Sequence, residues 1–368
     1  MKKTIILKLL LLLLLTGCSF FYRGSNSDDI DYPVYSEFLQ PTRTFSLEAS
    51  QHGYLGVKLL EHINDFLPNR LAFSNRELET ADWIVSTLID FGFDEKQIEV
   101  QTFYLHEETS SWWGSASHMI EWYAMQGYYD NLERLDFSQN IILTIPGKSK
   151  QTIIIGAHYD GVANPGISDN ASGVAMLLEN AYRMRDADNY YTLKYIFFGA
   201  EEVGLIGSFY YVDNMHKEEI ENLVLMINID VIMDGPELVF AIGFIESMPE
   251  FPMTILFDMP EISQNKKSTN IIELAYYLNE NKNINLISKP PGISVPTDHL
   301  PFIQFGIPVM TFFSTHPVEY PEVFIGDVLH SEKDCLDFIM ENFPGRVERA
   351  LFELGIFLEA VVQNELVQ

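Results

Sequence analysis

The residues best suited to chemistry lie where short apolar segments end. Ile153–Ile155 lead into His158 and Asp160, and Asp169 follows after a loop that contains glycine and proline. This order predicts a buried strand, a loop and then a helix, which together make half of a βαβ unit. Because the functional groups of open α/β sheets lie at the carboxyl ends of the strands, we expect these three side chains to share one edge of a sheet.

Two further apolar segments carry carboxylates. Residues 193–198 are followed by Gly199, Ala200 and then the adjacent pair Glu201 and Glu202, and the apolar run 226–232 contains Asp230. A carboxylate inside such a run is costly to bury unless a cation or hydrogen bonds compensate for it, and a metal ion is the simplest such partner. Adjacent carboxylates also repel each other unless a positive charge lies nearby. The run with Asp230 therefore favours a metal site, whereas Glu201 and Glu202 alone would more simply be a pair of surface residues.

Together, the strand ends supply imidazole and carboxylate ligands of the kind that zinc prefers. If Asp169 bridges two ions, the first would be bound by Asp169, His158 and Asp230. The second would be bound by Asp169, Glu202 and a histidine late in the chain. Three protein ligands for each ion leave room for a shared water molecule, as in hydrolytic metal sites.

Two acidic residues beside these ligands have separate expected roles. Asp160 is placed to accept the second ring proton of His158, which would fix the tautomer of that histidine. Glu201 is adjacent to a ligand but is itself free, so we predict that it is the general base for the water molecule. The histidines before residue 300, apart from His158, are more often surface or core residues than ligands.

The first residues predict export. Lys2 and Lys3 precede an apolar run, and residues 15–18 read Leu-Thr-Gly-Cys, so residues 1–17 have the order of a secretory signal peptide. The Leu-Thr-Gly-Cys ending resembles the lipobox of bacterial lipoproteins. The resemblance implies that a lipid on Cys18 anchors the protein to a bacterial cell membrane, at the outer membrane or the cell surface. The polar residues 18–43 are predicted to be a flexible tether.

Composition limits the remaining possibilities. Cys335 is the only cysteine besides the one expected to carry lipid, so stability must come from a core, which 47% hydrophobic residues can build. The formal net charge of −29 argues against nucleic acid as a partner. Residues 44–368 are predicted to form a single catalytic domain of the α/β class.

Several motifs resemble those of the family-28 metallopeptidases, the di-zinc aminopeptidases, in the family's order over about residues 44–366. The resemblance implies a three-layer α/β/α sandwich with a mixed, mostly parallel central sheet, as in zinc-dependent exopeptidases. It also implies two zinc ions, a catalytic Glu201, and a cis peptide bond between Asp169 and Asn170. By the same resemblance the zinc ligands include His158, Asp169, Glu202 and Asp230, with Asp160 behind His158. The motifs are Ala-His-Tyr-Asp-Gly, Ser-Asp-Asn-Ala-Ser-Gly, Gly-Ala-Glu-Glu-Val-Gly-Leu-Ile-Gly-Ser, Asn-Ile-Asp and Thr-Asp-His-Leu-Pro-Phe followed by Gly-Ile-Pro.

The last ligand departs from the family pattern. Many relatives have a tyrosine just before the final histidine and an aspartate four residues after it. His330 has Asp334 at that distance but Leu329 in place of the tyrosine, while the competing His316 has Tyr320. We favour His330, because a metal-bound histidine usually has an acidic or carbonyl acceptor. In relatives that tyrosine usually stabilises the oxyanion, so this role is left unassigned here, and Tyr320 is a candidate for it.

The resemblance implies metal-dependent hydrolysis of peptide bonds, with aminopeptidase activity on peptide or protein substrates. Glutaminyl cyclases form one alternative, since they share the fold, use one zinc ion, and resemble residues 298–302 and 320–324. The presence of both His158 and Asp230 favours two ions. A non-catalytic, lipid-anchored binding protein on the same scaffold is a second alternative. Substrate preference and oligomeric state cannot be read from the sequence.

Overall fold

The structure is a computed structural model. It describes residues 47–105, 110–111, 114–162, 164–235, 237–243, 266–288, 297–315 and 328–363. Contacts divide the chain into Met1–Pro41 and Thr42–Gln368, and all the described residues belong to the second unit. The predicted signal peptide, Cys18, the tether, His316 and Tyr320 lie outside the described residues. No helix in the described ranges combines the length and the apolar character that crossing a membrane requires.

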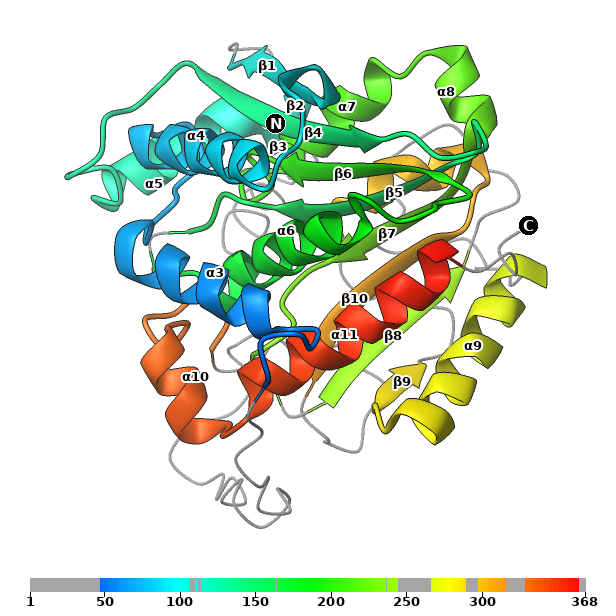
Figure 1. Cartoon of the computed structure of the whole chain (residues 1–368). Helices are drawn as coiled ribbons and strands as arrows, with labels where there is room; N and C mark the ends of the chain where they lie inside the picture. The colour runs from blue at the N-terminus through cyan, green and yellow to red at the C-terminus, as the bar shows by residue number, and fades with distance from the viewer. Residues whose placement is uncertain are drawn as a thin grey trace, which may run out of the picture. The chain divides into compact units, whose positions relative to one another are not determined.

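Within the described residues, eight strands form one mixed sheet (Figure 1). The central neighbours β6, β5, β7 and β10 run parallel, as do β8 and β9 at one edge, whereas β1–β4, β4–β6 and β10–β8 are antiparallel pairs. This arrangement confirms the mixed, mostly parallel sheet. In spatial order the strands are β1 (Ile98–Tyr104), β4 (Phe137–Ile145), β6 (Thr192–Phe198), β5 (Thr152–His158), β7 (Leu223–Ile229), β10 (Val309–Thr315), β8 (Glu237–Gly243) and β9 (Leu286–Ser288).

Both faces of the sheet are covered, which confirms the three layers. Alternate side chains of β5 point to opposite faces, so Ile153 and Ile155 belong to one apolar cluster and Ile154 to another. The first cluster packs under α3 (Tyr54–Phe66), α4 (Asn75–Asp90), α6 (Ser172–Met184), α9 (Lys266–Lys282) and α11 (Arg346–Gln363). The second packs under α7 (Ile206–Asp213) and the 3-10 helix Leu300–Phe305. Figure 1 shows α3, α6 and α11 side by side over the sheet.

The start of α4 follows from its sequence. Ser74 is the N-cap, and its side chain accepts the backbone N–H of Glu77. Ala81, Ile84 and Leu88 recur at helical spacing, and all three are buried. The spacing of these residues in the sequence predicts a helix over residues 74–91, which α4 confirms, and the helix brings Glu77 into the interior of the protein.

The first helix begins later than periodicity predicts. Helical periodicity in the sequence begins at Leu47 and predicts a helix from there, but α3 begins at Tyr54, after Gly53 in a left-handed conformation with φ 86°. Glu179 on α6 accepts the backbone N–H groups of Gly53 at 2.8 Å and Gly56 at 2.6 Å. This buried carboxylate satisfies the free donors of the helix terminus and so fixes where the helix starts.

Three other elements also differ from expectation. The apolar run predicts a strand over residues 225–232, but β7 ends at Ile229, so Asp230 lies beyond the strand. An amphipathic pattern from about Asp334 toward Val362 predicts one closing helix, but there are two, α10 (Leu336–Asn342) and α11, because Pro344 and Gly345 interrupt the pattern.

The aromatic-rich residues 104–129 lie between two predicted strands, and the sequence favours a β-hairpin there. The segment holds the short pair β2 (Ser110–Ser111) and β3 (Gly114–Ser115), followed by α5 (Ala116–Met125). The short helix α8 (Lys217–Asn222) precedes β7.

Candidate metal centre

The predicted ligands come from the carboxyl ends of neighbouring parallel strands. His158 is the last residue of β5, and Glu202 follows β6. Asp169 lies in the turn Ile167–Ala171 that leads into α6, where its own backbone is not helical, and Asp230 follows β7 directly. His330 lies on a turn before α10 and adopts φ 55°. Side chains that are far apart in the sequence therefore lie together at one edge of the sheet.

The carboxylate of Asp169 lies between two histidines. Its Oδ1 atom is 3.1 Å from Nε2 of His158, and its Oδ2 atom is 3.0 Å from Nε2 of His330. His158 Nε2 also lies 3.1 Å from Oδ1 of Asp230, and His330 Nε2 lies 3.3 Å from Oε2 of Glu202. These five side chains therefore lie in two groups of three that share Asp169, and their role as metal ligands stays a prediction.

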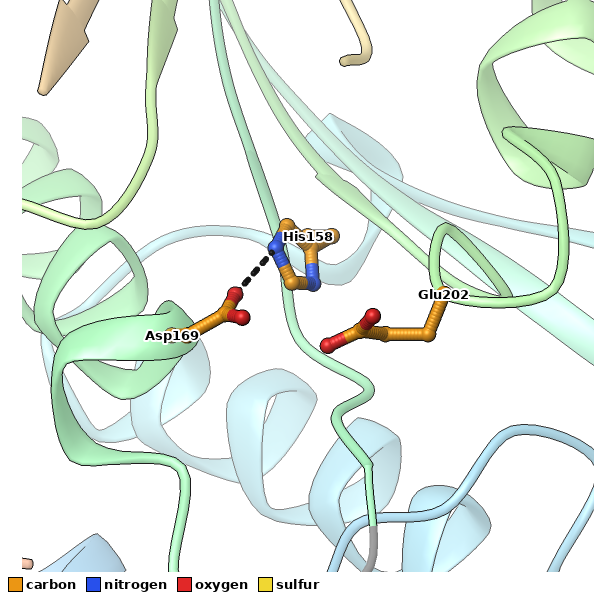
Figure 2. Close-up of side chains that lie close together, drawn as sticks. All are labelled: His158, Asp169 and Glu202. Atoms are coloured by element: carbon orange, nitrogen blue, oxygen red, sulfur yellow. Dashed lines mark ion pairs between the residues drawn. The ribbon is translucent and has the colours of Figure 1, made fainter. Parts of the chain in front are cut away.

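Three of these side chains, drawn from both groups, lie close enough together to bind one metal ion. His158, Asp169 and Glu202 have ligand atoms within 4.8 Å of one another, and all three residues are buried. Figure 2 shows Asp169 and Glu202 on either side of the His158 ring, with their carboxyl groups pointing toward each other. Oε1 of Glu202 is buried and has no hydrogen-bond partner. A buried carboxylate oxygen without a donor is costly, so the residues fit a bound cation.

Opposite charges face each other in this centre. Burial acts to lower the pKa of His158, but the charges of Asp230 and Glu201 raise it well above its usual value. Burial acts to raise the pKa of Asp169, but hydrogen bonds from His158 and His330 lower it. The cluster of carboxylates therefore needs positive charge close by. Zinc ions can supply it with neutral imidazoles as ligands.

Asp160 contacts His158 but does more than orient it. His158 Nδ1 lies 3.1 Å from the backbone carbonyl oxygen of Asp160 and 3.5 Å from its carboxylate Oδ1. The carbonyl is therefore the nearer acceptor for the ring proton, rather than the carboxylate that we expected. The two carboxylate oxygens accept the backbone N–H groups of Glu201 at 3.0 Å and Glu202 at 3.1 Å. Asp160 thus links the histidine to the turn that follows β6.

Glu201 lies beside the cluster without belonging to either group of three. Burial raises its pKa well above the usual glutamate value, and it interacts with the charges of His158, Glu202 and Asp230. A carboxylate whose pKa is raised binds a proton more readily near neutral pH, which suits proton transfer.

Asp334 has a different partner from the one expected. We expected it to accept a hydrogen bond from His330, but its carboxylate accepts the backbone N–H groups of Ser168 at 2.5 Å and Asp169 at 3.1 Å. The residue thus holds the backbone of the shared ligand rather than the ring of the histidine. The peptide bond between Asp169 and Asn170 is cis, which confirms the expectation from the family resemblance.

Residues 140–355, more than half of the chain, match the family model described as Peptidase family M28. The chain belongs to peptidase family M28. It is 35% identical over 115 residues to the probable lipoprotein aminopeptidase LpqL of Mycobacterium tuberculosis. The aligned residues make up 30% of this chain and 23% of LpqL. It is also 37% identical over 99 residues to the aminopeptidase YwaD of Bacillus subtilis, and these residues make up 26% of this chain and 22% of YwaD. These matches span less than a quarter of each relative's own length.

Solved structures share the fold. A zinc aminopeptidase from Bacillus subtilis superimposes with a TM-score of 0.63 at 17% identity, covering 87% of this chain and 97% of that one. The glutaminyl cyclase of Porphyromonas gingivalis superimposes with a TM-score of 0.57 at 18% identity, covering 85% and 98%. At such low identity the likeness extends to the fold alone. The M28 fold is therefore common to structures of hydrolases and of cyclases.

In this M28 chain, Thr297 and Arg70 support the predicted ligands, and neither was expected from the sequence. Thr297 donates its hydroxyl to Oδ2 of Asp230 at 2.6 Å, which leaves Oδ1 facing His158. Arg70 is 1% exposed and lies on the loop between α3 and α4. Its guanidinium donates to the carbonyl oxygens of Leu67, Tyr159, Pro165 and Gly166. No local pattern announces these contacts, although a lone arginine among apolar residues could have suggested a buried one.

Proposed function

We propose that this chain is a metallopeptidase of the aminopeptidase type that binds two zinc ions and uses Glu201 as general base. The observation that carries the proposal is the carboxylate of Asp169, whose two oxygen atoms face two different histidines. His158, Asp169 and Asp230 would hold one ion. Asp169, Glu202 and His330 would hold the other. A single zinc ion would leave one of the two groups of three without a cation.

Zinc bound here would polarise a substrate carbonyl and lower the pKa of a water molecule. Glu201 accepts a proton from that water and returns it to the leaving amine of the cleaved peptide. Its raised pKa favours the first transfer. Asp160 fixes the backbone of Glu201 and so keeps the base beside the ligands. Positioned acid–base groups of this kind contribute about 10²- to 10⁴-fold to rates.

The test is Glu201→Gln, with Glu61→Gln as a control at a surface glutamate. We expect Glu201→Gln to keep two zinc ions and the fold, and to lose activity on aminoacyl peptides by about 10²-fold or more. The control should match the wild type in all three measurements. Undiminished turnover in Glu201→Gln would remove the assigned base and with it this mechanism.

Cyclisation of an amino-terminal glutamine is the second candidate, and the fold shared with a glutaminyl cyclase supports it. Peptides with a free aminoacyl end, a blocked end and a glutaminyl end separate the possibilities when zinc is quantified in the same samples. Release of free amino acids with two zinc ions supports the peptidase. Loss of ammonia from the glutaminyl peptide with one zinc ion supports the cyclase. A protein purified without chelator that binds no zinc supports a non-catalytic binding protein.

We also propose that the protein is exported and anchored through a lipid on Cys18. The Leu-Thr-Gly-Cys motif supports this, as does the name lipoprotein given to the relative LpqL. Cys18→Ala should move the protein from the membrane fraction to the soluble fraction of expressing bacteria. An unchanged distribution would contradict the anchor.

A further inference from the structure

The turn after β6 presents consecutive backbone N–H groups to two buried carboxylates. Ala200 donates to Oε1 of Glu77 at 3.0 Å, while Glu201 and Glu202 donate to the carboxylate of Asp160. Glu77 belongs to the first turn of α4, and Asp160 follows β5. The backbone that carries the proposed base and one proposed ligand is therefore held by acceptors from two other elements.

Glu77 is enclosed by donors. Its side chain is buried, with the residue 1% exposed. Oε2 accepts the backbone N–H of Phe73 at 2.6 Å, and Oε1 accepts the hydroxyl of Ser138 at 2.7 Å in addition to the N–H of Ala200. Burial and the charge of Asp160 raise the pKa of Glu77, whereas the hydrogen bonds it accepts lower it. Each of its two oxygen atoms thus faces a backbone N–H group, which can only donate.

The turn depends on such contacts because its backbone is not intrinsically favoured. Ala200 adopts φ 54°, a left-handed conformation that residues with a Cβ atom rarely occupy. A Cβ atom on the preceding Gly199 would lie 2.5 Å from the carbonyl oxygen of Gln139 and from the hydroxyl of Ser138, so the chain passes very close to β4. A change in the acceptor of the Ala200 N–H is therefore expected to move the residues that follow it.

We propose that Glu77 is a positioning residue for Glu201 and Glu202: it accepts the N–H of Ala200 and so fixes the turn that directs both carboxylates into the metal centre. This inference rests on the proposed function and deepens it. Glu77 is not one of the proposed ligands, and the hydrogen-bond partners of its carboxylate are Phe73, Ser138 and Ala200. It acts through the backbone, and its loss would misplace one ligand and the base together.

The same side chain also supports the start of α4, and its two oxygen atoms separate the two roles. Oε2 contacts Phe73, just before the helix, while Oε1 contacts the turn. Ser74 supports the helix start independently, through its hydroxyl and the N–H of Glu77 at 3.2 Å. Ser74→Ala therefore weakens the same helix terminus without removing the acceptor from the turn, which makes it the matched control.

The experiment compares Glu77→Gln with Ser74→Ala in the full chain. Glutamine has nearly the shape of glutamate but only one acceptor oxygen, so one of the two backbone donors must face an NH2 group. We expect Glu77→Gln to weaken zinc binding by about tenfold or more, because the loss of a residue that supports a metal ligand commonly has an effect of this size. Competition with a fluorescent chelator measures the zinc affinity. We expect kcat to fall by a similar factor and KM to change by less than about threefold. Ser74→Ala should lower the Tm of the zinc-free protein and leave zinc affinity and kcat unchanged.

Wild-type zinc affinity and kcat in Glu77→Gln would overturn the proposal, as would equal losses in Ser74→Ala. If Glu77→Gln does not fold, Glu77→Asp replaces it, because its shorter side chain keeps the charge but cannot reach both donors. Wild-type zinc affinity in that variant would equally count against the proposal. If the wild-type protein binds two zinc ions but cleaves no peptide, the proposed function fails, and the zinc titration alone decides the role of Glu77.

Discussion

Oδ2 of Asp169 lies 3.0 Å from Nε2 of His330, a residue that reaches the centre from a turn late in the chain. The other oxygen of the same carboxylate faces His158. One side chain is thus common to both groups of proposed ligands, and the ligand sets cannot be altered independently at this position.

Asp169→Ala is expected to abolish binding of both zinc ions, because the substitution removes a ligand from each group of three. His330→Ala should abolish only the ion shared with Glu202. Metal content after dialysis, measured by mass spectrometry, gives about zero ions for the first variant and one for the second. Circular dichroism checks that both variants are folded. Retention of one tightly bound ion by Asp169→Ala would contradict the bridging role.

Asp334→Asn tests whether the hydrogen bonds that hold the backbone of Asp169 matter for zinc binding. The two oxygen atoms of Asp334 accept the backbone N–H groups of Ser168 and Asp169, and asparagine can accept only one of them. We expect zinc affinity to fall about 10- to 100-fold, as is common when a partner behind a ligand is lost. Asp337→Asn, at an exposed position of α10, is the control. Equal affinities in the two variants would show that Asp334 does not matter for the site.

Removal of zinc should destabilise the folded chain. Burial and the negative charge of Asp169 raise the pKa of Glu202, which reflects repulsion between buried carboxylates that a bound cation would relieve. A ligand that binds only the native state and is present at about 100 times its Kd adds about 3 kcal/mol. We therefore expect chelation to lower the Tm by about 5 °C or more in a thermal scan. Asp169→Ala, which should bind no zinc, provides the control, and its Tm should not respond to the chelator.

Folding stability should also depend on pH through His299. This residue is 1% exposed, and neither ring nitrogen has a hydrogen-bond partner among the described residues. Burial lowers its pKa from 6.5 to about 4. The unfolded chain therefore takes up a proton between these values while the native chain does not. Stability is lost as the pH falls from 6.5 to 4, by about 3 kcal/mol.

His299→Leu removes the titrating group and should flatten the pH dependence of the free energy of unfolding over that interval. Urea denaturation of the two proteins at several pH values measures it. His118→Gln, at an exposed position of α5, controls for the loss of an imidazole. The same slope in the His299 variant and the wild type would refute the prediction.

The sheet and the proposed ligands could be predicted because their signals are local. Ile153–Ile155 and residues 193–198 are apolar runs that end in polar residues, and each pattern can be read within a short window. The limits of other elements could not be predicted in this way. Glu179 determines where α3 begins, yet it lies on α6, far along the chain.

The supporting contacts were missed for the same reason. Asp160 was expected to orient His158, and it lies against that ring, but the hydrogen bonds from its carboxylate to the backbone of Glu201 and Glu202, on a different strand end, were not expected. Asp334 lies four residues from His330, a spacing that suggested a contact between them, but its partners are at Ser168 and Asp169. Backbone N–H groups carry no sequence signature, so acceptors that bind them cannot be assigned from residue types.

Arg70 and Glu77 lie before residue 140, where the match to the M28 family begins. A gene fragment trimmed to residues 140–355 would encode every proposed zinc ligand and the proposed base, yet it would lack the guanidinium under the His158 loop and the carboxylate under the turn after β6. The residues that match the family model are thus fewer than those that contact the proposed centre and the loops around it. A protein prepared for the tests above should therefore begin upstream of α3.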